Sequence, residues 1–183
     1  MSAAKKLAIV VGIQFLVLFS VLGFKQYTVR TGETVLLKVQ PVDPRDLVRG
    51  DHITVQYEIS RLSRSDVAWD NDAPTCCQAP VYVELQKQDD GYWKAVAVHG
   101  DRTHSRDGTV LIRGTVQDNY VSSTQRAEIR YGIEDIFIPE GSGGQVPSGS
   151  GHSVAVAVKV DRFGNAVPRH FVVDGVPVKL ERR

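Results

Sequence analysis

The segment His52-Ile53-Thr54-Val55-Gln56-Tyr57-Glu58-Ile59 alternates strictly between polar and apolar residues. Successive side chains of a β-strand point to opposite faces, so a period of two predicts a strand with one buried face. The apolar face carries Ile53, Val55, Tyr57 and Ile59, and the outward face carries His52, Thr54, Gln56 and Glu58. We therefore predict a β-strand over residues 52–59 that packs its apolar face on a core.

The same period recurs on both sides of this segment. Alternate positions are apolar in four further runs: Val35, Leu37 and Val39; Val81, Val83 and Leu85; Val110, Ile112 and Val116; and Val154, Val156, Val158 and Val160. Two turn sequences, Asp89-Asp90-Gly91 and Arg162-Phe163-Gly164-Asn165, each predict a hairpin. We expect a mainly β fold, a mostly antiparallel β-sandwich or small barrel-like domain over residues 28–183, with a flexible loop at about residues 141–151.

The N-terminal part of the chain is apolar instead. Residues 7–24 read LAIVVGIQFLVLFSVLGF and contain no formal charge. At about 1.5 Å per residue this run makes about 27 Å of helix, which crosses the hydrocarbon core of a bilayer. A cleaved signal peptide is the alternative, but its apolar region usually runs only about 7–15 residues. We predict a transmembrane anchor helix over residues 7–24.

The charges beside this helix predict its orientation. Lys5 and Lys6 precede the apolar run, and the positive-inside rule assigns them to the cytoplasm. Residues 1–6 then form a cytoplasmic tail, and the β domain lies on the extracytoplasmic side. Within the helix, Gly12 and Gly23 are eleven residues apart, about three turns, and share one side. With Ser20, they are candidates for contact with a partner helix.

The composition and the absence of known motifs limit the classes of function that the sequence supports. The chain has 183 residues and a formal net charge of +1, which argues against a nucleic-acid partner. The five histidines form no H-x-x-x-H pair, and the sequence has no C-x-x-C, Walker A or G-x-S-x-G motif. His99 and His104 flank Asp101, and we interpret them as a chance cluster in a surface loop. We predict no metal site, no cofactor and no catalytic residue.

Cys76 and Cys77 are adjacent and are the only cysteines. Adjacent thiols close a strained eight-membered ring, and strained disulfides are easily reduced. An oxidised pair is compatible with the outer side of a membrane. The sequence leaves a vicinal disulfide and free or intermolecularly paired thiols as alternatives.

The segment Pro41-Val-Asp-Pro-Arg-Asp-Leu-Val-Arg-Gly-Asp51 is dense in charged and turn-forming residues. Asp43 suits a helix N-cap, Pro44 the first helical position, and Asp46 imitates a capping box. Gly50 then ends the turn before the strand from His52. We predict one helical turn between two strands, a structural role that extends to the neighbouring Arg49 and Asp51.

The same region resembles the signature of the GDYXXLXY proteins, a family of bacterial membrane-anchored proteins. Gly50, Asp51 and Tyr57 match the signature, whereas His52 replaces its tyrosine and Val55 its leucine. The resemblance continues, in chain order, through these segments: the N-terminal apolar helix, Gly32–Lys38, Pro41–Leu47, Val81–Leu85, Gly91–Lys94, Tyr131–Glu134 and Phe137–Gly141. It implies the bacterial cytoplasmic membrane, with the β domain in the periplasm. It also implies an accessory role beside a multi-span membrane protein, and no established activity.

These observations favour a non-catalytic, single-pass accessory or structural subunit of a membrane assembly. Its partners would be the lipid bilayer and a multi-span membrane protein, and the outward face of the strand 52–59 would contact that protein. One alternative is a hydrolase resembling membrane-anchored signal peptidases, but Gln40, Pro41 and Val42 stand where such an enzyme has its nucleophilic serine. A small-ligand-binding β domain is the other alternative.

The predicted orientation can be tested by proteolysis. Protease added to intact spheroplasts should remove the domain that follows residue 28, because only the tail before Leu7 lies inside. Cleavage that requires permeabilised cells would reverse the orientation.

Overall fold

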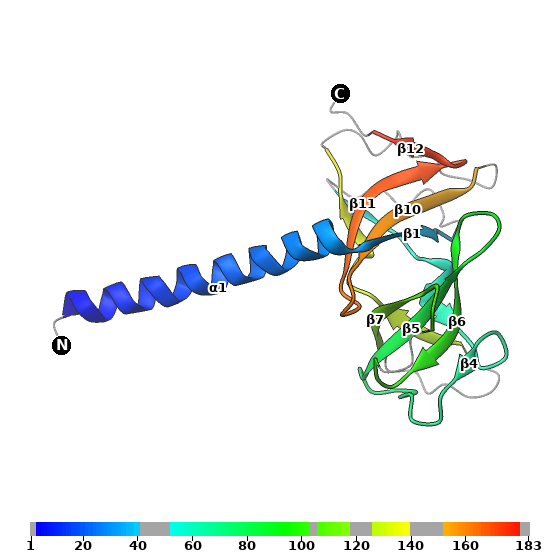
Figure 1. Ribbon diagram of the computed structural model, residues 1–183, viewed down its shortest axis with the longest axis horizontal. Coiled ribbons are helices and arrows are strands. Elements are labelled where there is room, and N and C mark those ends of the chain that lie inside the picture. Colours follow the sequence, from blue (N-terminus) through cyan, green and yellow to red (C-terminus); the bar gives the residue numbers. More distant parts are fainter. Residues whose placement is uncertain (1–2, 41–51, 103–105, 118–125, 140–151, 180–183) are drawn as a thin grey trace.

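The computed structural model describes residues 3–40, 52–102, 106–117, 126–139 and 152–179. Within them, one long helix, α1 (Ala3–Thr31), projects from one side of a β domain (Figure 1). The helix is long and apolar enough to cross a membrane. Its large apolar residues are exposed, from 41% at Val11 to 70% at Phe24, so the β domain does not cover them.

The helix α1 is longer than the apolar run. It continues past Phe24 to Thr31, so the β pattern expected from residue 28 begins only at Glu33. Residues 25–31 contain neither glycine nor proline to end the helix. The hydroxyl of Thr31 also donates to the Tyr27 carbonyl oxygen at 2.9 Å, which satisfies an acceptor in the last turn.

Two larger sheets and one small sheet make up the β domain. The four-stranded sheet is antiparallel and has the order β1 (Glu33–Lys38), β10 (Val154–Val160), β11 (Ala166–Val173), β12 (Val176–Val178). The six-stranded sheet has the order β3 (Arg61–Leu62), β8 (Ala127–Arg130), β7 (Thr109–Val116), β5 (Pro80–Lys87), β6 (Trp93–His99), β4 (Ala68–Trp69). The small sheet pairs β2 (His52–Thr54) with β9 (Asp135–Phe137). Among the pairings of these strands, only that of β4 with β6 is parallel.

The curled sheets form a half-barrel around one apolar cluster. Its largest fully buried side chains are Tyr57, Phe171, Leu37, Ile53, Leu85 and Ile112, and all of these except Phe171 of β11 come from the alternating runs. Both predicted hairpin turns are present, between β5 and β6 and between β10 and β11. The prediction of a mainly β, mostly antiparallel fold is confirmed.

The strand predicted over residues 52–59 is wrong in its length. Strand β2 ends at Thr54, Tyr57 makes an isolated bridge to Val39, and η1 (Glu58–Ser60) is a short 3-10 helix. The predicted inward face is nevertheless buried over its whole length. Alternation reports which side chains face the core, but a strand also requires a neighbouring strand for its backbone groups. Here β9 offers only three residues of pairing.

A buried carboxylate joins α1 to the β domain. Asp161, only 4% exposed, opens the turn between β10 and β11 and accepts the Thr28 hydroxyl of α1 at 2.7 Å. It also accepts the backbone N–H groups of Phe163 and Asn165 and the side-chain amide of Asn165. Burial raises the pKa of Asp161, but the hydrogen bonds from Asn165, Thr28 and the turn outweigh it and lower this pKa. One carboxylate therefore fixes both the turn and the end of the helix.

Gly32 lets the chain pass from α1 into β1 at this point. Its N–H donates to the Thr28 carbonyl oxygen at 2.9 Å, and its own carbonyl oxygen accepts Lys159 Nζ at 2.9 Å. A Cβ atom at Gly32 would lie 2.5 Å from the Thr28 carbonyl oxygen and 3.0 Å from the Val160 backbone. Since these neighbours are backbone atoms, they cannot rotate away.

We expect Gly32→Ala to lower the free energy of unfolding by about 1–3 kcal/mol, the usual range for added atoms in a filled space. Urea unfolding of the full chain in mild detergent, followed by tryptophan fluorescence, measures this loss. Gly12→Ala is the matched control, because a Cβ there meets no atom within 4 Å. Equal stability of both variants would contradict a tight junction.

Candidate functional site

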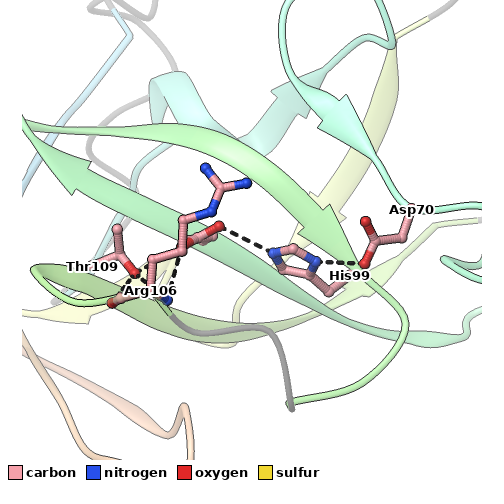
Figure 2. A network of polar contacts seen from close by, with 5 residues as sticks. Asp70, His99, Arg106 and Thr109 are labelled. Carbon is pink, nitrogen blue, oxygen red and sulfur yellow. Dashed lines mark hydrogen bonds and ion pairs between the residues drawn. The ribbon is translucent and has the colours of Figure 1, made fainter.

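The most concentrated polar cluster in the described residues surrounds Glu84 of β5, whose side chain is fully buried. Its Oε1 accepts the Thr109 hydroxyl at 2.7 Å and the Arg106 backbone N–H at 3.2 Å. Its Oε2 lies 3.2 Å from His99 Nε2, and His99 Nδ1 lies 2.6 Å from Asp70 Oδ2. Figure 2 shows His99 beside Asp70 at one end of this network, with Arg106 and Thr109 at the other.

Strand pairing brings these residues together. Tyr82 lies opposite His99 and Glu84 opposite Ala97, so Glu84 and His99 share one face of neighbouring strands. Val83 and Leu85 point the other way, into the core. Asp70 directly follows β4, whose parallel pairing with β6 sets it beside His99, and its N–H donates to Val98. The network therefore lies on the side of the sheet that faces away from the core.

Hydrogen bonds keep the buried carboxyl ionised. Burial raises the pKa of Glu84, but the bonds from Thr109, His99 and Arg106 together hold this pKa below its usual value. Both ring nitrogens of His99 face carboxylate oxygens. Both contacts are hydrogen bonds at once only when the ring carries two protons or one carboxyl is protonated.

This geometry suits a structural role. A histidine that acts as a base needs a ring nitrogen within reach of substrate, with the other nitrogen oriented by a partner. Here carboxylates occupy both nitrogens of His99, whose exposed fraction is 4%. The network connects the residue after β4 with β5, β6 and the first residue of β7, so it links four neighbouring strands of the six-stranded sheet.

The interpretation of His99 as a surface-loop residue was wrong, because His99 is the last residue of β6 and is buried. His104 lies outside the described residues, and those residues contain no group of three metal-binding side chains that could hold an ion. Sequence reasoning also missed Glu84. The only signal was its position within the apolar run Val81–Leu85, where a carboxylate requires several hydrogen-bond partners.

The signature residue Tyr57 is part of a second buried polar arrangement. Its hydroxyl donates to the Ile133 carbonyl oxygen at 2.8 Å, and the Tyr131 hydroxyl donates to the Ile59 carbonyl oxygen at 2.7 Å. Each tyrosine hydroxyl therefore binds the segment that carries the other tyrosine, so two hydrogen bonds join residues 57–59 to residues 131–133. Burial, followed by the charge of Glu134, raises the pKa of both hydroxyls, so both remain protonated donors.

The segment before His52 carries the two other signature matches, Gly50 and Asp51, and the predicted helical turn. Asp43, Pro44, Asp46, Arg49, Gly50 and Asp51, the helical turn predicted for them, and the loop predicted at residues 141–151 lie outside the described residues. His52 is described through its backbone, which pairs with Phe137.

The predicted contact face is only partly brought together. The hydroxyl of Thr54 donates to Asp135 Oδ1 at 2.8 Å, and Thr54 and Gln56 line an open groove of about 480 Å³ with Glu128. Glu58 is exposed but does not line this groove, because the strand gives way to η1. The face that alternation predicted is therefore divided between two elements.

The remaining candidates lie on α1 and in the segment before β5. A Cβ atom added at Gly12 or Gly23 would meet no atom outside the helix's own backbone within 4 Å, and Ser20 is exposed like its neighbours, so this side of the helix is open. Cys76 and Cys77 form a disulfide with each other. Cys77 and the following Gln78 adopt positive φ values, which allow the chain to turn toward β5.

Together these features define a class of protein: a β half-barrel that follows one N-terminal helix long and apolar enough to cross a membrane. Within that class the chain belongs to the GDYXXLXY family, since the family model described as GDYXXLXY protein matches residues 14–171. The comparisons with curated proteins and with solved structures found no match. The resemblance carried by Gly50, Asp51 and Tyr57 is confirmed.

We expect Glu84→Gln to destabilise the protein by about 1.5–3 kcal/mol at pH 7, the usual range for hydrogen bonds to a charged group. Because folding lowers the pKa of Glu84, its ionised form stabilises the fold above the usual glutamate pKa. That stabilisation is lost as the pH falls through the lowered value. The difference between wild type and variant should therefore shrink in acid.

Urea unfolding between pH 7 and pH 3 measures this difference. Glu33→Gln is the matched control, since Glu33 is exposed and should change stability by less than about 0.5 kcal/mol. A pH-independent difference between wild type and Glu84→Gln would show that the charge of Glu84 does not contribute.

Proposed function

We propose that this protein is a non-catalytic, single-pass accessory subunit of a membrane assembly, with its β domain on the extracytoplasmic side. The observation that carries the proposal is the exposed apolar surface of α1. The large apolar side chains between Leu7 and Phe24 are exposed and lie outside the β domain. An exposed apolar surface of this size marks contact with a membrane or with another protein, so we assign lipid and the helices of a membrane protein as its cover.

Rigid attachment of the β domain supports a role in protein contact. The bonds of Thr28 and Lys159 to the junction fix the direction in which the domain leaves the helix. A partner that binds α1 therefore meets one defined side of the domain. Preorganisation of this kind lowers the entropy lost on association.

The small sheet offers the best contact surface. Phe137 of β9 is 85% exposed and lies opposite His52, the position where the family signature has tyrosine. Beside it is an open groove of about 510 Å³, lined by Ile136, Ile138, Phe171 and Val178 among others. Exposed aromatic residues beside an apolar surface are typical of protein interfaces. We propose that a loop of a multi-span partner docks here.

The buried network supports a function without catalysis. In the described residues, the histidine with the most developed set of carboxylate partners is His99, and it is closed to substrate. Its neighbours fix strands rather than present a reactive atom.

Co-purification in mild detergent tests this proposal. In the full chain, His52→Glu with Gln56→Glu places two charges on the predicted face, and Phe137→Ala removes the exposed ring. Each variant should reduce the recovered partner at least several-fold, measured by quantitative mass spectrometry against the wild type. Thr34→Glu, an exposed position of β1, is the matched control and should leave recovery unchanged.

Unfolding curves must first show that each variant is folded. Undiminished recovery with folded variants would remove this face from the interface. The side of α1 that carries Gly12, Ser20 and Gly23 would then be the main contact. The amount of a true partner should rise in proportion to the amount of wild-type protein that is purified. If no co-purified protein shows this proportion, the accessory role itself is wrong.

A further inference from the structure

Three cations gather where α1 meets the β domain. Lys25 of α1, Arg113 of β7 and Arg130 of β8 line one open groove of about 720 Å³ and are exposed. Arg113 lies two residues before Thr115, which pairs with Arg130, so both arginines project from the same face of the sheet.

The groove has a rigid wall. The turn between β10 and β11 closes onto β7, where Arg113 N–H donates to the Gly164 carbonyl oxygen at 2.9 Å. Gly164 has a φ of +85°, and a Cβ there would lie 3.0 Å from the Arg113 backbone nitrogen. Only glycine combines this conformation with so close an approach. Figure 1 shows the turn between β10 and β11 on the side of the β domain from which α1 extends.

The cations have no carboxylate partner within the described part of the chain. Two acidic residues also line the groove, but both already accept hydrogen bonds. Glu134 Oε1 accepts the Tyr131 backbone N–H at 2.6 Å, and Asp135 Oδ1 accepts the Thr54 hydroxyl. Three cations against two carboxylates leave the groove positive, with two guanidinium groups free to donate.

The position of Lys25 sets the depth of the groove in a membrane. Lys25 directly follows Phe24, the last residue of the apolar run, so its Cα lies about 1.5 Å further along the helix axis. The headgroup layer extends about 5–7 Å beyond the hydrocarbon core on each side of a bilayer. Because the junction at Asp161 and Gly32 fixes the domain, Arg113 and Arg130 are held beside the same layer.

We propose that this groove binds the phosphate headgroup of an anionic phospholipid in the leaflet next to the β domain. Guanidinium groups bind phosphate oxygens through paired, charge-assisted hydrogen bonds, and Lys25 adds a third cation. The lipid's acyl chains would lie along the exposed apolar side of α1 below Phe24. The inference rests on the proposed membrane span of α1, but it needs no partner protein.

Native mass spectrometry of the full chain in a non-ionic detergent tests the site. Titration with dioctanoyl phosphatidylglycerol should give one saturable bound lipid. Dioctanoyl phosphatidylcholine, which has no net charge, should bind at least about fivefold more weakly. Each basic residue near an anionic lipid contributes about fivefold in affinity, so Arg113→Gln with Arg130→Gln should weaken phosphatidylglycerol binding by about twentyfold or more. Lys25→Gln should weaken it by about fivefold.

Lys94→Gln, an exposed cation of β6 outside the groove, is the matched control and should bind like the wild type. Equal binding of the two lipids, or equal affinity of the double variant and the wild type, would overturn the proposal. If inorganic phosphate or glycerol 3-phosphate displaces the lipid at concentrations near that of the lipid, the groove binds a free phosphate, and the assignment to a phospholipid is wrong. Since no partner protein is present, this result is independent of the co-purification experiment.

Discussion

The hydrogen bond from Thr28 to Asp161 fixes the β domain relative to α1, and the position of every proposed contact surface depends on it. A helix that merely tethered its domain would give the domain no fixed orientation toward the membrane. Here the buried carboxylate of Asp161 accepts hydrogen bonds both from the last turn of α1 and from the turn between β10 and β11, and Gly32 allows the two backbones to approach closely. The contact surface and the basic groove are therefore held at defined positions relative to the helix.

Buried polar groups carry out the same task inside the β domain. The contact between Glu84 and His99 links neighbouring strands on the outer side of the six-stranded sheet. The hydroxyls of Tyr57 and Tyr131 each bind a carbonyl oxygen beside the other tyrosine, which joins residues 57–59 to residues 131–133. A buried polar group without partners destabilises a fold, so each of these side chains requires its neighbours in place. Such groups specify one arrangement of strands, which apolar packing alone specifies less sharply.

Local sequence patterns predicted those parts of the structure that depend on local physics. The apolar run from Leu7 to Phe24 predicted the helix, because helix length and hydropathy need no other part of the chain. Alternation around Ile53 and Tyr57 predicted which side chains are buried. It failed for the length of the strand, since β9 pairs with only three residues, and for His99, whose environment comes from Asp70 and Glu84.

The sequence by itself determined a membrane-length apolar helix, a mainly β domain, the positions of its hairpin turns and its family, because composition and period carry this information along the chain. Only the tertiary structure decided which charges are buried and which remain available. Thr28 and Asp161 are 133 residues apart, and Lys25, Arg113 and Arg130 come from three separate elements. Whether a carboxylate or a guanidinium group has a partner depends on strand order and on the direction in which α1 leaves the domain. No local pattern of residues encodes that.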